Sequence, residues 1–189
     1  MAFPSLSIGD LTAKMPIVQG GMGVGISLSG LASAVANQGG IGVIAGAMIG
    51  MKEPDVAKNP IEANLRALRQ ELTKAREKTQ GIIGVNIMVA LTTFSQMVRT
   101  AIENRADIIF SGAGLPLEMP KHLLQACEEK KEEFKTKLVP IVSSARAATL
   151  IARKWLSRFD YLPDAFVVEG PKAGGHLGYK ADQIEDEHY

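Results

Sequence analysis

A single histidine stands among residues that have almost no side chain, in the stretch VVEGPKAGGHLGYK at residues 167–180. An apolar run leads to the carboxylate of Glu169, and glycine and alanine then surround His176. An imidazole can accept or donate a proton near neutral pH, which suits general acid–base catalysis. The small neighbours would leave space for a flat cofactor and a substrate. The pattern therefore predicts a site in which His176 transfers a proton.

Other unusual residues also follow apolar runs. The stretch QGGMGVG, at residues 19–25, follows MPIVQ, and Asn86 lies near the end of GIIGVNIM. SGAG at 111–114 and SSAR at 143–146 follow two later runs. The carboxyl ends of parallel strands meet on the active face of a (β/α) barrel, or in the crevice of an open doubly wound sheet. We therefore expect these clusters to lie near one another, where a ligand can approach the backbone closely.

Two other kinds of site do not fit the sequence. A dinucleotide fingerprint that starts at Gly21 would need a glycine where Ile26 stands, and one that starts at Gly23 would need it at Leu28. A metal site needs convergent ligands, and His122 and His188 fall on a predicted helix and on the C-terminal segment. We therefore predict neither a Rossmann site nor a metal site.

The elements that must position these residues alternate along the chain. Continuous apolar runs without polar alternation are typical of strands that are covered on both faces. Six such runs predict strands at 15–19, 39–46, 81–88, 106–112, 137–144 and 164–170. Between them, apolar residues at helical spacing predict helices around residues 31–38, at 59–78 and 93–103, at about 117–134, and from about Ser144 onward. We expect Asn59 to cap the second helix, with Pro60 in its first turn and Glu62 completing a capping box. Alternation of this kind predicts parallel βα units.

The composition limits the classes of protein that fit. Hydrophobic residues make up 46% of the 189 residues, enough for a core, and the formal net charge of +1 gives no reason to expect nucleic acid or an anionic membrane surface. The one cysteine, Cys127, rules out an internal disulfide, and we expect it to be a small buried hydrophobe. No apolar stretch is long enough to span a membrane, and no signal peptide is evident. We expect a soluble, cytoplasmic protein.

Three of these stretches together resemble a known family. PIVQGGMG at 16–23, GVNIM at 84–88 and VVEGPKAGGHLG at 167–178 are similar to the nitronate monooxygenase family, also called the 2-nitropropane dioxygenase family. The FMN-dependent enoyl-[acyl carrier protein] reductases of the same superfamily look similar over the same stretches. The resemblance runs from about Pro16 to Lys180, with AGGH as its most specific motif.

The resemblance implies a TIM (β/α)8 barrel that holds FMN at its carboxyl face. Residues matching the family's flavin-binding positions are Gly21, Met22, Gly23, Asn86, Glu169, Gly174 and Gly175. His176 matches the family's catalytic histidine. A lysine that some members carry on strand five has no counterpart, and Ser143 and Ser144 stand there instead.

The implied chemistry divides by subgroup. A nitronate monooxygenase uses FMN and O2 to convert an alkyl nitronate to a carbonyl compound and nitrite, and His176 would take a proton from a neutral nitroalkane or orient the nitronate. An enoyl reductase would instead use NAD(P)H and FMN to reduce an enoyl thioester. A non-catalytic small-molecule binder on a degenerate barrel is the third hypothesis. The expected partners are small molecules, with a homodimer as the candidate oligomer.

The number of predicted strands bears on the domain organisation. A barrel needs eight strands, and about six βα units are visible in the sequence. We therefore interpret residues 1–189 as the N-terminal part of one FMN-binding barrel domain, without strands seven and eight. The phosphate site of such barrels usually lies after those two strands, so we expect weak FMN retention and unpaired sheet edges that favour aggregation in a chain of this extent.

Overall fold

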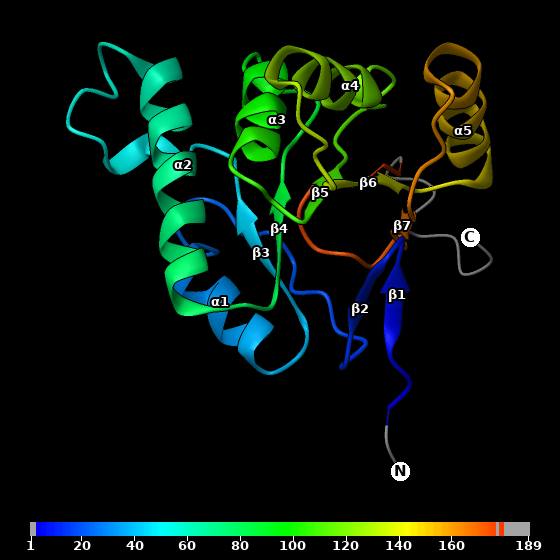
Figure 1. Ribbon diagram of the computed structural model, residues 1–189, viewed down its shortest axis with the longest axis horizontal. Helices are drawn as coiled ribbons and strands as arrows, with labels where there is room; N and C mark the ends of the chain where they lie inside the picture. Colours follow the sequence, from blue (N-terminus) through cyan, green and yellow to red (C-terminus); the bar gives the residue numbers. More distant parts are fainter. Residues whose placement is uncertain (1–2, 177, 180–189) are drawn as a thin grey trace.

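Strands and helices alternate along the computed structural model, which describes residues 3–176, 178 and 179 (Figure 1). A hairpin of β1 (Leu6–Ile8) and β2 (Leu11–Ala13) comes first. The later strands are β3 (Ile41–Ala45), β4 (Ile82–Asn86), β5 (Ile108–Ser111), β6 (Lys137–Val142) and β7 (Val167–Val168). The helices are α1 (Ser29–Asn37), the short 3-10 helix η1 (Ile49–Lys52), α2 (Pro60–Lys78), α3 (Phe94–Glu103), α4 (Met119–Lys130) and α5 (Ala145–Phe159).

The order of the strands decides between the two α/β architectures. The sheet runs β3-β4-β5-β6-β7, and every neighbouring pair is parallel. Successive helices also contact one another in chain order, from α1 and α2 to α4 and α5. A doubly wound sheet would reverse its strand order at a switch point, and this sheet does not. The described residues therefore form an arc of a barrel, with its helices along one face.

Two hydrophobic clusters cover the two faces of this arc. The larger one joins the helices to alternate strand residues such as Ile44, Val85 and Ile109. The smaller one contains Ile41, Val43, Ile108, Phe110 and Val139 from the other face of the sheet, together with Ile8 and Ala13 of the hairpin. This alternation follows from the two-residue period of a strand. The inner face of the arc is thus packed against the β1–β2 hairpin.

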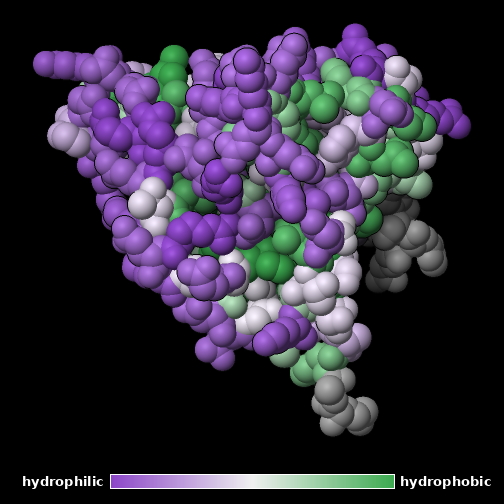
Figure 2. All heavy atoms as spheres, in the orientation of Figure 1, coloured by the Kyte–Doolittle hydropathy of each residue, from purple (hydrophilic) through white to green (hydrophobic). Residues whose placement is uncertain are grey.

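The outward sides of the helices are mostly polar. On the face of the molecule that Figure 2 shows, hydrophilic residues predominate, and smaller hydrophobic areas appear between them. Helices that bury one apolar stripe against a sheet present their charged and polar residues on the opposite side.

A glycine sets the distance between α1 and the sheet. A β-carbon on Gly42 of β3 would lie 1.8 Å from the carbonyl oxygen of Ala32 in α1. Carbon and oxygen atoms cannot approach so closely, so only glycine fits there. Ala32 is fully buried as a result.

The helix starts differ in how they are capped. The backbone N–H of Ala147 donates to the hydroxyl of Ser144 (3.3 Å), which caps α5 at its predicted start. The predicted cap of α2 is wrong, because the side chain of Asn59 makes no cap hydrogen bond and donates instead to Asp55. Pro60 does occupy the first turn of α2.

Partly buried carboxylates tie the amino ends of the strands together. Asp107 Oδ2 accepts from the N–H of Ile83 (2.7 Å) and from Arg76 Nη2 (2.6 Å). Asp164 Oδ2 accepts from the N–H of Leu138 (2.8 Å) and from the Tyr161 hydroxyl (2.7 Å). Each aspartate precedes one strand and satisfies an N–H of its neighbour, which stabilises this end of the sheet.

Two predicted strands need correction, and one hairpin was missed. Residues 15–19 form no strand, because Val18 makes only an isolated parallel bridge to Ile41. The last predicted strand, at 164–170, is reduced to Val167–Val168. The β1–β2 hairpin was not predicted, although its Gly9–Asp10 turn, with Gly9 at φ +58°, is a recognisable hairpin signal.

Candidate functional site

The first loop is held to β3 by two side chains that the sequence analysis did not single out. Gln19 Nε2 donates to the carbonyl of Val43 (3.0 Å), and its Oε1 accepts from the N–H of Val43 (3.2 Å). The same Nε2 donates to the hydroxyl of Ser27 (2.8 Å), which is fully buried. Gln19 therefore replaces part of the strand pairing that residues 15–19 lack. The sequence could have indicated Gln19 and Ser27 only through their positions at the two ends of the predicted glycine-rich loop.

Ser27 also fixes the conformation of residues 20–27. The N–H of Met22 donates to Ser27 Oγ and the N–H of Ser27 donates to the carbonyl of Met22, both at 3.0 Å. Both backbone polar groups of Met22 are therefore occupied, and its side chain is exposed. The N–H groups of Gly21 and Gly23 have no partner among the described residues. Of the three predicted flavin-binding residues in this loop, only Gly21 and Gly23 therefore have a backbone N–H that is open to a ligand.

Gly21 and Asn86 lie in direct contact. A β-carbon on Gly21 would lie 2.5 Å from Cβ of Asn86, so the absence of a side chain lets the loop close over the end of β4. Asn86 pairs with Ala45 and Phe110 in the sheet and is half-buried. Its side-chain amide has no hydrogen-bond partner among the described residues. A half-buried amide with unused donors and an unused acceptor is suited to a polar ligand.

The chain after β7, drawn in red in Figure 1, turns back to β6. Ser143 Oγ donates to the carbonyl of Gly178 (3.0 Å), and the N–H of Gly178 donates to Glu169 Oε2 (3.3 Å). The hydroxyl of Tyr179 lies 2.8 Å from the carbonyl oxygen of Glu169 and 3.2 Å from that of Ser143. Tyr179, which the sequence analysis did not single out, thus bridges the carboxyl ends of β6 and β7.

His176 is exposed, and its imidazole has no hydrogen-bond partner among the described residues. A β-carbon on Gly174 or Gly175 would meet no atom within 4 Å, and Gly175 adopts φ +87°. The structure therefore brings Gly21 to Asn86 and joins Glu169 to the loop beyond it. No described contact links His176 to either pair.

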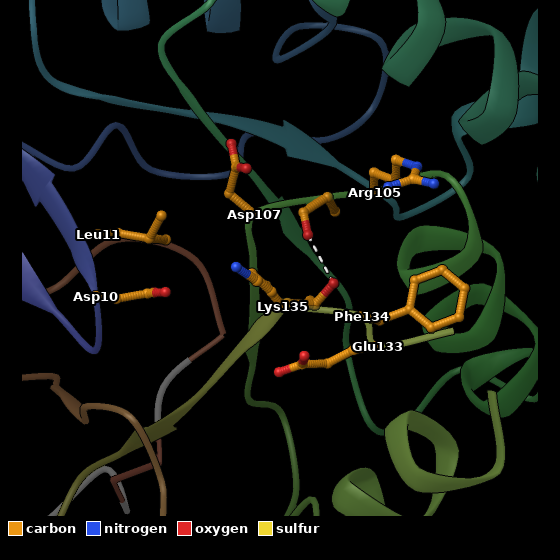
Figure 3. A pocket seen from close by; sticks show the side chains of 9 residues that line it. Asp10, Leu11, Arg105, Asp107, Glu133, Phe134 and Lys135 are labelled. Carbon is orange, nitrogen blue, oxygen red and sulfur yellow. Dashed lines mark hydrogen bonds between the residues drawn. The ribbon is translucent and has the colours of Figure 1, made fainter. Parts of the chain in front are cut away.

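Two hollows lie at the opposite end of the sheet. They measure about 300 and 500 Å³ and share five lining residues, Asp10, Glu133, Phe134, Lys135 and Thr136. Figure 3 shows the smaller one, with Asp107 and Arg105 also lining it. Asp10 pairs with Lys137 (2.8 Å), and Thr136 donates to the carbonyl of Ala106 (2.8 Å). Residues at the amino face of such barrels serve stability, so we do not place the chemistry there.

Two other kinds of feature are absent from the described part of the chain. No group of three or more His, Cys, Asp or Glu side chains is placed to hold a metal ion in residues 3–176, 178 and 179. None of the described helices combines the length and the apolar character that a membrane crossing requires.

Comparisons with known proteins agree with this architecture. The family model described as nitronate monooxygenase matches residues 5–189. A curated protein of Mycobacterium tuberculosis, (3aS,4S,5R,7aS)-5-hydroxy-7a-methyl-1-oxo-octahydro-1H-indene-4-carboxyl-CoA dehydrogenase, is 29% identical over 163 residues, which cover 86% of this chain and 38% of that protein. The structure of FabK from Thermotoga maritima superposes with a TM-score of 0.64 at 29% identity and covers 87% of this chain and 43% of its own. A variant of the same FabK gives 0.63, with 45% of its chain covered. The chain thus spans about two-fifths of the length of these relatives.

Proposed function

The chain belongs to the nitronate monooxygenase family, and from that premise we propose that it is part of an FMN-dependent oxidoreductase that oxidises alkyl nitronates with O2 to carbonyl compounds and nitrite. The observation that carries the proposal is the juxtaposition of Gly21 and Asn86 at the carboxyl ends of the strands. Unpaired backbone and amide groups meet there, on the face where enzymes with this fold place their chemistry.

These residues fit a flavin. The ring of FMN is flat and carries alternating hydrogen-bond donors and acceptors along one edge. The N–H groups of Gly21 and Gly23 and the amide of Asn86 could serve that edge, since all three lack partners among the described residues. Glu169, Gly174 and Gly175 would line the other side of the ring. When bound, FMN would supply the electron transfer, which no side chain of this protein can provide.

We assign the proton transfer to His176. An imidazole at the edge of a glycine-rich loop can reach a ligand without displacing other side chains, and His176 is exposed, with no hydrogen-bond partner among the described residues. It would take a proton from the α-carbon of a neutral nitroalkane, or hold a nitronate anion in place. Catalytic hydrogen bonds often form only when the substrate is bound, so the absence of a partner in the free protein is compatible with this role.

The enoyl-thioester reductase remains the second candidate. The Mycobacterium tuberculosis relative is named for a carboxyl-CoA compound, which is a thioester, and this favours a thioester substrate. In that reaction, NAD(P)H would be the reductant, and His176 would supply the proton to the α-carbon. The two candidates therefore differ in what reduces the flavin.

Anaerobic reduction of the flavin tests both candidates. We expect an alkyl nitronate, but not NAD(P)H, to bleach the flavin absorbance of the purified flavin-loaded enzyme. Bleaching by NAD(P)H alone would favour the enoyl reductase instead, and no bleaching by either would favour the non-catalytic binder.

A substitution of His176 tests its role separately. His176→Asn should lower turnover of neutral nitroalkanes by about 10²–10⁴-fold, the usual scale for a general acid or base. Turnover of nitronates formed beforehand should fall less, because their proton is already lost. Flavin content should stay unchanged, and wild-type turnover of the neutral substrate would refute the assignment.

A further inference from the structure

The chain segment that carries His176 is fastened at both of its ends. We call residues 169–179 the histidine loop; they are drawn mainly in red in Figure 1. At the start of the loop, the N–H of Glu169 donates to the last residue of β6 (2.9 Å). At its end, the partly buried hydroxyl of Tyr179 lies 2.8 Å from the carbonyl oxygen of Glu169 and 3.2 Å from that of Ser143. Because Tyr179 bonds to the residue at which the loop begins, the loop is closed into a ring.

Gly178 completes this closure. Its carbonyl accepts from Ser143 Oγ (3.0 Å), and its N–H donates to Glu169 Oε2 (3.3 Å). A β-carbon on Gly178 would lie 2.6 Å from Ser143 Oγ, so a larger residue would force the loop away from β6. We call the four residues Ser143, Glu169, Gly178 and Tyr179 the latch.

Between its two ends, the histidine loop has little else to hold it. Within residues 170–176, the only backbone hydrogen bond to a described residue runs from the N–H of Ala173 to the carbonyl of Gly170 (3.1 Å). A β-carbon on any of the three glycines in this segment would meet no atom within 4 Å. Glycine has more conformational freedom to lose than any other residue, so such a segment keeps one conformation only if its ends are fixed. The exposed His176 lies at the end of the segment, two residues before the latch.

We propose that Tyr179 is a positioning residue, which holds His176 at the carboxyl ends of β6 and β7 by keeping the latch closed. A general base must lie within hydrogen-bond reach of the proton that it removes, and a displacement of about 1 Å can lower the rate by about 100-fold. Tyr179 has no contact with the reacting atoms in this assignment and acts only through the imidazole. The inference rests on the proposed function of His176, whereas closure of the loop by the latch does not depend on turnover.

Tyr179→Phe removes the hydroxyl and leaves the ring in place. With the purified flavin-loaded enzyme, we expect turnover of a neutral nitroalkane to fall by about 10–100-fold. Turnover of the nitronate formed beforehand should fall by less than about 3-fold, because its proton is already lost. Deuterium at the α-carbon of the nitroalkane should also slow the variant more than the wild type, since proton removal becomes the limiting step. Equal losses on the two substrates, or no loss on either, would overturn the proposal.

Two further variants separate positioning from general stability. Tyr161→Phe is the matched control, because it also removes a partly buried hydroxyl, which bonds to Asp164 (2.7 Å) at the opposite end of the sheet. It should leave the ratio of the two turnovers unchanged. Ser143→Ala removes the bond to Gly178 but keeps those of Tyr179, and should lower turnover of the neutral substrate by about 3–10-fold. It also provides a second latch variant if Tyr179→Phe unfolds, and an unchanged ratio in the folded latch variants would contradict the proposal.

A double substitution tests whether Tyr179 acts through His176. Residues that act as one unit are not additive, so Tyr179→Phe should lower turnover by less than about 2-fold when His176→Asn is already present. A further loss of about 10–100-fold in that background would show that Tyr179 acts on the reaction independently of His176, and would overturn the positioning role.

Limited proteolysis of the purified full chain measures the latch without turnover. Lys172 is exposed within the histidine loop, so trypsin can cleave after it when the loop opens. Loss of the hydroxyl should raise the rate of cleavage after Lys172 by about 5-fold in Tyr179→Phe but not in Tyr161→Phe. Unchanged cleavage would show that the hydroxyl does not hold the loop, and would contradict the proposal even if nitronates are turned over. If cleavage rises but neither nitronates nor enoyl thioesters are turned over, the proposed function fails while closure of the loop by Tyr179 is supported.

Discussion

Replacing Gly21 with alanine tests the contact on which the candidate site is built. The new β-carbon would lie 2.5 Å from Cβ and 3.0 Å from Cγ of Asn86, whereas carbon atoms pack best at about 3.5–4.0 Å. Neither side can move easily. Asn86 is flanked by Val85 and Ile87, which are both fully buried, and Ser27 holds the loop. The two carbons must therefore separate by roughly 1 Å within a packed region.

The expected cost follows from this overlap. Overpacking of this kind destabilises a protein by about 1–3 kcal/mol. A loss of about 2 kcal/mol would lower the melting temperature of a domain of this size by about 4–8 °C. Asn86→Gly removes the opposing β-carbon, so Gly21→Ala should cost almost nothing in that background. The coupling free energy between the two positions should then approach about 2 kcal/mol.

Thermal unfolding followed by circular dichroism measures these differences. Two controls isolate the steric cause. Gly20→Ala should be nearly neutral, because a β-carbon there would meet no atom within 4 Å. Asn86→Ala keeps its β-carbon and should leave the penalty of Gly21→Ala in place. The reasoning is refuted if Gly21→Ala melts at the temperature of Gly20→Ala, or if it costs as much with Asn86→Gly as with Asn86.

Three further predictions concern the scaffold. Gly42→Ala should lower the free energy of unfolding, measured by chemical denaturation, by more than about 3 kcal/mol or abolish folding, because its β-carbon would lie 1.8 Å from the Ala32 carbonyl oxygen. Gly30→Ala, at an exposed position of α1, is the control and should be neutral or stabilising in the same measurement. Tyr161→Phe should cost about 1–2 kcal/mol in the same measurement, because it removes the 2.7 Å hydrogen bond to Asp164, and a change below about 0.3 kcal/mol would contradict this. The pKa of His122 is lowered, chiefly because burial disfavours the charged imidazolium. The positive charges of Lys121 and Arg99 lower it further, whereas the negative charge of Glu118 acts in the opposite direction. The unfolded chain therefore binds a proton at His122 more readily than the folded chain does. Stability should therefore fall as the pH drops below about 6.5, and His122→Gln should lessen that fall when unfolding is compared between about pH 7.5 and 5.5.

Local patterns in the sequence predicted most of the elements. The apolar runs at 39–46, 81–88, 106–112 and 137–144 contain β3, β4, β5 and β6, and helical spacing located the five α-helices. These predictions succeeded because strand and helix periodicities depend on neighbouring residues. The prediction for the run at 15–19 failed because only Val18 forms a bridge to β3, at Ile41, and beyond it the side chain of Gln19 rather than the backbone pairs with Val43.

The family resemblance on three stretches is confirmed, and the parallel strands in chain order agree with the predicted barrel. The roles of His176, Glu169 and the glycines remain predictions.

Only the tertiary structure decided which of the site residues meet. The sequence marked Gly21 and Asn86 as separate features, and nothing local to either shows that one needs the space left by the other. No local pattern indicates that Ser27 occupies the backbone of Met22, or that Tyr179 bridges Ser143 and Glu169. These are contacts between segments far apart in the chain or across a loop. They depend on how the sheet curves and how the loops pack at its carboxyl edge, whereas a periodic pattern specifies only which face of an element is buried.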